Sequence, residues 1–218
     1  MDIYKFIEEN ITDQSCFFEV GSHFGIDTAK IIKFTSNIHC FEPDLRNIEI
    51  FKKLGLSVVL NQIAISNIDG YAEFYLSSGN VYESKYGPTN NEILNRNDWS
   101  ASSSLKLPKN HKIVTPWVKF ENNINVQTKR IDTYCLEKNI EKIDFIWMDV
   151  QGAEMDVIQG MGNMKNKIHF IYTEYSDNEL YENQPTKDQI IENLGNDWRL
   201  VFDFGGDILL ENKKFMKI

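Results

Sequence analysis

The sequence predicts an α/β fold with a mostly parallel central sheet, helices on both faces and a C-terminal antiparallel hairpin. Short apolar runs alternate with helical patterns along the 218 residues, as in parallel strands joined by helices. A glycine turn separates the first run from the helix after it, and two runs joined through Gly205-Gly206 indicate the hairpin. We expect residues 1–218 to form one domain, because this length suits a single core.

The first half of the chain supplies three predicted helices and four predicted strands. The helices cover residues 2–10, 26–34 and 45–54, and the strands cover 16–20, 38–41, 57–60 and 71–76. In the first helix Ile3, Phe6 and Ile7 share one face. Pro43 ends the second strand and suits the first turn of the third helix, which Gly55 ends.

Residues 77–116 show no clear periodicity and are rich in Ser, Asn, Gly, Pro and Lys. A segment this long without regular structure is typical of a lid or a binding loop, or else of disorder. Ser102, Ser103 and Ser104 lie inside it, either as hydroxyl donors from a lid or as plain loop residues.

In the second half of the chain, apolar runs again alternate with helical patterns. Strands are predicted at residues 117–128, 143–148, 167–172, 198–202 and 207–210, and helices begin near residues 130, 152 and 186. The run 143–148 is the most hydrophobic strand and stops at Asp149.

The composition narrows the classes of partner and compartment. A formal net charge of −9 argues against nucleic acid or an anionic membrane as the main partner. Cys16, Cys40 and Cys135 lack metal-ligand spacing, so we expect free thiols in a reducing compartment. The first ten residues lack the apolar segment of a targeting signal, and no run approaches membrane-spanning length. These features indicate a cytoplasmic protein; they say nothing about its oligomeric state.

The turn after the first strand is the first candidate for a binding site. Gly21 and Gly25 frame it and Glu19 precedes it, while the dinucleotide pattern G-x-G-x-x-G is absent. This form is seen where S-adenosylmethionine (SAM) binds. Ser22 and His23 lie inside the turn, close to the expected cofactor. His23 is either a catalytic base or a structural residue of the turn.

Acidic residues end three of the predicted strands. Glu42 could accept both hydroxyl hydrogens of a ribose, or it could be an exposed carboxylate at a helix start. Asp149 would face the methyl group of SAM, could cap the next helix, or could do both. Glu174 could line the acceptor pocket, and Glu154, in a first helical turn, needs no site role. Asp149, Glu154 and Glu174 together could bind a divalent cation, although their spacing does not require it and we predict no metal.

In these motifs the sequence resembles the FkbM-type SAM-dependent methyltransferases over roughly residues 16–175. The stretches that carry the resemblance are Phe18–Gly25, Phe41–Pro43, Ala64–Ser66, Ser103–Leu105, Arg130–Asp132 and Ile143–Glu154. The specific part is Asp149-Val-Gln-Gly-Ala-Glu154, where the family typically has Asp-Val-Glu-Gly-Ala-Glu. The chain departs from the family at Gln151, which replaces that Glu, and at Trp147, where Lys is common.

The resemblance implies a Rossmann-like class I methyltransferase that transfers a methyl group to a hydroxyl of a sugar, a glycan or a small metabolite. The residues it implies for cofactor binding are Glu19, Gly21, Ser22, His23, Gly25, Glu42, Pro43, Ala64, Ser103 and Asp149. Asp149, Glu174 and His23 are the candidates for the catalytic base. Two alternatives stay open, a SAM-fold binding or scaffold subunit without turnover and a nicotinamide-dependent oxidoreductase.

Overall fold

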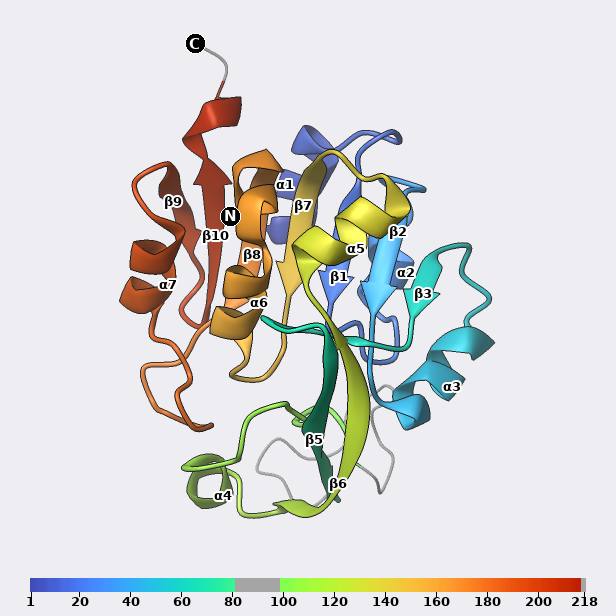
Figure 1. Ribbon diagram of the computed structural model, residues 1–218, viewed down its shortest axis with the longest axis vertical. Coiled ribbons are helices and arrows are strands. Elements are labelled where there is room, and N and C mark those ends of the chain that lie inside the picture. Colours follow the sequence, from blue (N-terminus) through green and yellow to red (C-terminus); the bar gives the residue numbers. More distant parts are fainter. Residues whose placement is uncertain (81–98, 217–218) are drawn as a thin grey trace.

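The computed structural model describes residues 1–80 and 99–216 and contains, within them, a main sheet in the order β3-β2-β1-β7-β8-β10-β9 (Figure 1). Its strands are β1 (Phe17–Val20), β2 (Ile38–Phe41), β3 (Val59–Asn61), β7 (Ile143–Met148), β8 (Ile168–Glu174), β9 (Trp198–Asp203) and β10 (Asp207–Asn212). The first five in spatial order are parallel, and β10 is antiparallel to both β8 and β9. The predicted fold class and the terminal hairpin are therefore confirmed.

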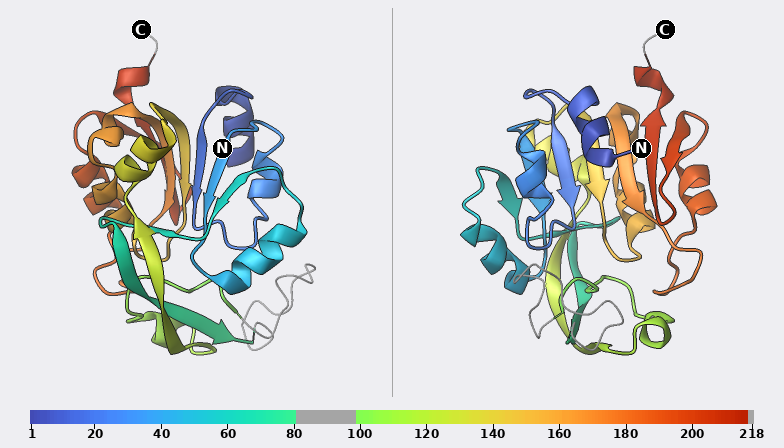
Figure 2. Two further views of the ribbon diagram at one scale, coloured as in Figure 1. Left: turned by 45° about the vertical axis from the view of Figure 1, so that its right-hand side comes forward. Right: turned by 180° about the vertical axis from the view of Figure 1, so that it is seen from behind.

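Helices cover both faces of the main sheet (Figures 1 and 2). One face carries α1 (Ile3–Asn10), α2 (Thr28–Ile31) and α3 (Leu45–Lys53), and the other carries α5 (Ile131–Lys138), α6 (Glu154–Gly160) and α7 (Lys187–Leu194). Strands buried on both faces need apolar residues at successive positions, which explains the continuous runs in β1, β2 and β7.

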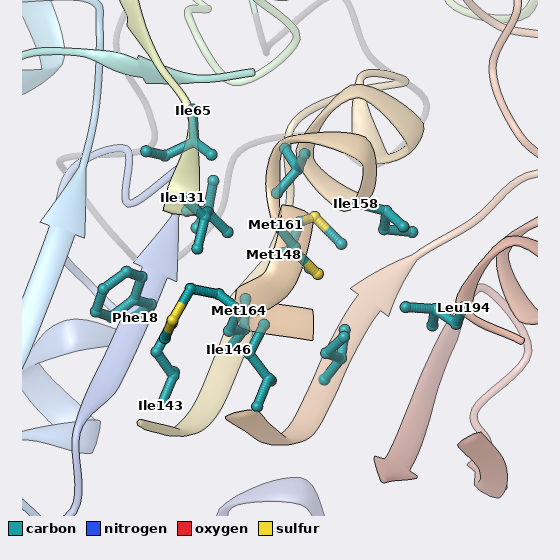
Figure 3. Packing of buried hydrophobic residues seen from close by; sticks show 14 of the residues in the cluster. Phe18, Ile65, Ile131, Ile143, Ile146, Met148, Ile158, Met161, Met164 and Leu194 are labelled. Atoms are coloured by element: carbon teal, nitrogen blue, oxygen red, sulfur yellow. The ribbon is translucent and has the colours of Figure 1, made fainter. Parts of the chain in front are cut away.

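Figure 3 shows the core between the sheet and the α5–α6–α7 layer. Ile146 and Met148 of β7 point into it beside Ile131 of α5 and Met161, the residue after α6. The three cysteines are buried and free, as expected. None of the helices in the described residues combines the length and the apolar composition needed to cross a membrane.

Helix ends follow local side-chain chemistry, with one difference from the prediction. Asp2 caps α1 through the backbone N–H of Lys5, and Thr186 and Gln189 form a capping box at α7. The predicted helix at residues 26–34 is reduced to the four residues of α2. Asp27 at its start does not cap it, because its carboxylate instead accepts hydrogen bonds from Tyr4 and Lys30.

A second, three-stranded sheet lies beyond the carboxyl ends of the parallel strands (Figures 1 and 2). Its order is β4-β6-β5, with β4 (Ala64–Ile65) parallel to β6 (Val118–Lys129) and β5 (Gly70–Gly79) antiparallel to β6. The sequence predicts β5 and β6 as separate strands, but it does not predict that they pair with each other. Ser100, Ala101, Ser103 and Leu105, which lie between β5 and β6 in the chain, line a cavity together with the ends of β1, β2 and β7.

The predicted loop at 77–116 is divided. Its first residues complete β5, and α4 (His111–Val114) occupies part of its second half. Ser100, Ser102 and Ser104 are buried, and Ser104 pairs with Tyr75 of β5. Residues 81–98 of this loop lie outside the described residues, and its role as a lid stays a prediction.

Candidate active site

A cavity of about 280 Å³ opens at the carboxyl ends of the parallel strands, beside the second sheet. The strand order runs one way from β1 to β2 and β3 and the other way from β7 to β8. Open α/β sheets bind ligands at such a reversal, because the loops that follow the two central strands separate there. The turn after β1, the ends of β2 and β7, strands β4 and β5 and residues 100–105 all contribute to its wall.

The glycine turn is shaped by packing as much as by any ligand. Gly21 has φ +87°, and a Cβ placed on it would lie 1.8 Å from the backbone oxygen of Asp149. Gly25 has φ +77°, and its Cβ would meet the ring of Phe51. Gly21 lines the cavity and Gly25 does not. Gly25 is thus needed for the turn and its contact with α3 rather than for direct contact with a ligand.

Glu42 joins the end of β2 to the glycine turn. Its Oε2 accepts the backbone N–H of His23 at 2.8 Å, and its Oε1 accepts the backbone N–H of Asp44 at 2.8 Å and the side-chain amide of Asn47 at 3.2 Å. The residue is buried, which excludes the reading as an exposed helix-start carboxylate. Burial raises the pKa of Glu42 to about 7, against the lowering effect of these hydrogen bonds.

His23 is held in one tautomer by a chain of hydrogen bonds. Asn47 donates its amide to Glu42, so its oxygen accepts the hydroxyl of Ser100 at 2.6 Å. Since that hydroxyl hydrogen is used, the 2.9 Å contact between Ser100 and His23 requires Nε2–H of His23 to donate. Burial lowers the pKa of His23 to about 4, so the ring is neutral at pH 7.

Glu19 and Ser22 are two further polar residues of the cavity wall. The hydroxyl of Thr28 and the thiol of Cys40 donate to Glu19 Oε2, and burial raises the pKa of Glu19 to about 8. Ser22 Oγ is buried and has no hydrogen-bond partner within the described part of the chain. A buried hydroxyl without a partner is costly unless a ligand supplies one, so its position in the cavity wall fits a polar ligand.

Another part of the cavity wall is apolar. It comprises Phe41, Ala64, Ile65, Phe74 and Leu105. Ala64 and Phe74 belong to a small cluster that the second sheet forms with Leu105. A flat, largely apolar group such as a nucleobase fits this part, and the polar turn after β1 fits a charged or hydroxylated group.

Asp149 follows β7 directly and lines the cavity. The Nε2 amide of Gln151 donates to Asp149 Oδ1 at 2.7 Å and to Glu174 Oε2 at 3.1 Å. Burial and the nearby Asp149 raise the pKa of Glu174 to about 9, so Glu174 is protonated at pH 7. Desolvation by the surrounding protein also raises the pKa of Asp149, and the hydrogen bond from Gln151 lowers it in part. The reading of Asp149 as a helix cap is wrong, because Ala153 stands at the N-cap of α6.

Glu154 lies behind this pair and outside the cavity wall. It is fully buried, and its Oε1 accepts the backbone N–H of Gly152 at 3.1 Å. Burial raises its pKa to about 7. Within residues 1–80 and 99–216, no three His, Cys, Asp or Glu side chains are arranged to hold a metal ion. Asp149 and Glu174 are instead bridged by an amide.

The structure brings most of the predicted residues together. The predicted cofactor residues that line the cavity are Glu19, Gly21, Ser22, His23, Glu42, Pro43, Ala64, Ser103 and Asp149. Glu174 reaches the site through Gln151. Asn47 and Ser100 were not predicted. The sequence pattern could have identified Asn47, because it is a polar residue on the buried face of α3, next to Ile48.

Comparison with known proteins agrees with this geometry. The family model described as methyltransferase FkbM domain matches residues 19–204. The 2-O-methyltransferase NoeI of Sinorhizobium fredii is 36% identical over 209 residues, which cover 90% of this chain and 79% of that protein.

Solved structures resemble the fold at low sequence identity. A methyltransferase FkbM from Methylobacillus flagellatus superposes with a TM-score of 0.52 at 11% identity. The match covers 92% of this chain and 44% of that structure, so the chain spans less than half its length. An rRNA methylase from Streptococcus thermophilus gives a TM-score of 0.48 at 11% identity, covering 96% of this chain and 93% of that one.

Proposed function

This chain belongs to the FkbM methyltransferase family, and we propose that it transfers the methyl group of SAM to a hydroxyl of a sugar, a glycan or another small metabolite. SAM dependence and O-methylation follow from the family and from the relative NoeI, which is named a 2-O-methyltransferase. The class of acceptor and the roles of individual residues are the proposal. The observation that supports it most is the carboxyl of Asp149 in the cavity wall, bridged through Gln151 to a second carboxyl.

The cavity fits SAM in both its polar and its apolar parts. Glu42 Oε2 accepts a single hydrogen bond within the described structure, which leaves capacity for a ribose hydroxyl. Ser22 Oγ would gain the partner it lacks, and the carboxyl of Glu19 would face the cationic end of the cofactor. The apolar wall around Phe74 would take the adenine. His23 would position Glu42 and Ser100 rather than take a proton, because its pKa is lowered to about 4.

Asp149 would act as the base. Bound SAM supplies an electrophilic methyl group on its sulfonium. An acceptor hydroxyl becomes a good nucleophile only as its proton leaves, and Asp149 offers a carboxylate oxygen for that proton. Glu174 keeps its own proton at pH 7 and so leaves the negative charge on Asp149. Holding the hydroxyl and the methyl group in line would supply much of the remaining acceleration.

The floor beside Asp149 suits a hydroxylated ring. Trp147 lines the cavity and packs against Tyr172 at 4.5 Å and Tyr4 at 5.7 Å between ring centroids. Asp207 stands opposite Glu174 in the register of β8 and β10. Aromatic faces favour the C–H surface of a sugar, and carboxyls accept hydrogen bonds from its hydroxyls. The negative charge that remains on Asp149 repels an anionic acceptor, which also argues against nucleic acid.

A methylation assay with matched acceptors tests this proposal. The protein is incubated with isotope-labelled SAM and a panel of neutral sugars, each paired with its phosphorylated form, and products are identified by mass spectrometry. We expect methyl ethers of the neutral members and at least tenfold less product from the phosphorylated ones. Preference for a phosphorylated sugar, or methylation on nitrogen, would contradict the proposed acceptor class. A cytoplasmic location also belongs to this proposal, supported by the three free thiols.

A further inference from the structure

The side chain of Gln151 lies between the two carboxyls of the site. One amide nitrogen donates to Asp149 Oδ1 at 2.7 Å and to Glu174 Oε2 at 3.1 Å. An amide nitrogen carries two hydrogens, so each carboxyl can receive one of them. The two carboxyls set the orientation of the amide, with its nitrogen toward them. The hydroxyl of Tyr181 lies 3.1 Å from Gln151 Oε1 and shares its one hydrogen between that oxygen and the backbone carbonyl of Ser102.

The backbone of Gln151 is fixed as firmly as its side chain. Its φ is +53°, and its carbonyl oxygen accepts the hydroxyl of Ser104 at 2.7 Å. The next residue, Gly152, packs so closely on Tyr181 that a Cβ there would lie 2.8 Å from Tyr181 Cβ. The distance from the hydroxyl of Tyr181 to the carbonyl oxygen of Ser102 is 2.8 Å. The segment 102–104 and the ring of Tyr181 therefore hold Gln151 from both sides.

We propose that Gln151 is a positioning residue, which orients Asp149 as the base of the methyl transfer proposed above and keeps the single proton of the pair on Glu174. This inference rests on the proposed function. A shorter bond to Asp149 than to Glu174 matches the assignment, because hydrogen bonds to an ionised acceptor are the shorter ones. Gln151 itself cannot take up a proton, so it links the two carboxyls without competing for it.

The surroundings make this arrangement sensitive to the residue at position 151. Two carboxyls that share a site ionise one after the other, and a third would compete for the same proton. The other titratable groups that face the pair are Glu154 from α6, Asp207 from β10, Asp27 from the β1–α2 turn, and Tyr172 and Tyr181. The carboxyls among them disfavour further negative charge, so donated N–H groups matter more here than at an exposed site.

Two variants separate the hydrogen bonds of Gln151 from its shape. Gln151→Met keeps the length of the side chain and removes both donors, and Gln151→Glu replaces the amide with a third carboxyl. The matched control is Gln159→Met on the exposed side of α6, where, among the residues that the structure describes, the side chain bonds Asn67 alone. Two quantities are measured, the pH profile of kcat and the titration of Asp149 and Glu174 by carbon-13 NMR in cofactor-free protein. Asp149→Asn and Glu174→Gln assign the two resonances.

We expect Gln151→Met to lower kcat at pH 7 about 10-fold to 100-fold, to raise the first apparent pKa of the pair by about one unit, and to recover activity at higher pH. KM for SAM should change little, and Gln151→Glu should shift the profile further in the same direction. The control should match the parent in both measurements.

Unchanged NMR titration in both Gln151 variants would overturn the inference. A loss of kcat that is equal at every pH would overturn it as well, because that result describes a purely steric role. Failure of the proposed function gives a different result, because the parent protein would then methylate no acceptor. The titration of the two carboxyls needs no substrate, so it would still show whether Gln151 controls their proton.

Discussion

Gly21 packs directly against the backbone carbonyl of Asp149, so the turn after β1 and the turn after β7 fit together only without a side chain at position 21. A Cβ there would lie 1.8 Å from that oxygen, well inside any tolerable contact. The contact joins the proposed cofactor-binding turn to the proposed base. Gly21 therefore matters for the folding of the site as well as for space around a ligand.

Gly21→Ala should destabilise the protein by about 2–5 kcal/mol, the sum of strain at positive φ and a backbone clash. Gly205→Ala is the matched control, because Gly205 also has positive φ but a Cβ there would lie within 4 Å of no atom in residues 1–80 and 99–216. It should cost only about 1 kcal/mol. Urea unfolding followed by circular dichroism measures both. Equal losses would show that the contact with Asp149 contributes nothing.

Glu42→Ala should weaken SAM binding by about 1.5–3 kcal/mol, since a charge-assisted hydrogen bond to the ribose is lost. The same change frees the backbone N–H of His23, which loosens the turn. Glu49→Ala on the exposed face of α3 is the control and should bind as the parent does. Isothermal titration calorimetry decides, and unchanged affinity of Glu42→Ala would remove the ribose assignment.

Asp149→Asn should reduce kcat at least about 100-fold while SAM affinity and thermal stability stay close to those of the parent protein. Asparagine keeps the shape of the side chain but cannot accept the acceptor's proton at neutral pH. Asp188→Asn, exposed in the first turn of α7, is the matched control. A variant at position 149 that keeps most of its activity would assign Asp149 an orienting role and make Glu174 the next candidate for the base.

The stability of the cofactor-free protein should fall as pH rises from about 6.5 to 8. Burial raises the pKa of Glu154 from 4.5 to about 7, so the folded protein holds a proton that the unfolded chain has released. Such a group stabilises the fold fully below its unfolded pKa and loses that contribution as pH rises through the folded one. Glu19, Glu42 and Glu174 act in the same direction. Histidines, whose ordinary pKa is about 6.5, influence stability mainly below this window.

Glu154→Gln isolates one of these contributions, because glutamine is neutral at every pH. Its melting temperature should fall less between pH 6.5 and 8 than that of the parent protein. The exposed Glu192→Gln in α7 should keep the parent's dependence on pH. If Glu154→Gln and the parent show parallel curves in differential scanning calorimetry, Glu154 is ionised in the folded state and the assignment of its proton is wrong.

The sequence by itself determined the main sheet and the location of the site. Continuous apolar runs such as 143–148 indicate strands covered on both faces, and the acidic residues that follow the runs 38–41 and 143–148 indicate where ligands bind, because parallel strands end at one edge. Glu42 and Asp149 could be named on this ground alone. Glu19 and Gly21 could be named as well, since a glycine turn between a strand and a helix is a local pattern.

Only the tertiary structure decided how those residues act together. The pairing of β5 with β6 joins residues that lie from 39 positions (Gly79 and Val118) to 58 positions (Gly70 and Thr128) apart, and no local pattern encodes such a register. That pairing carries Ser100 to His23 and Ser104 to Gln151. Likewise, the protonation of Glu174 depends on burial and on charges from β7, α6 and β10, which meet only in the folded chain. Strand periodicity is a property of neighbours in sequence, whereas hydrogen bonds and desolvation at a site are properties of neighbours in space.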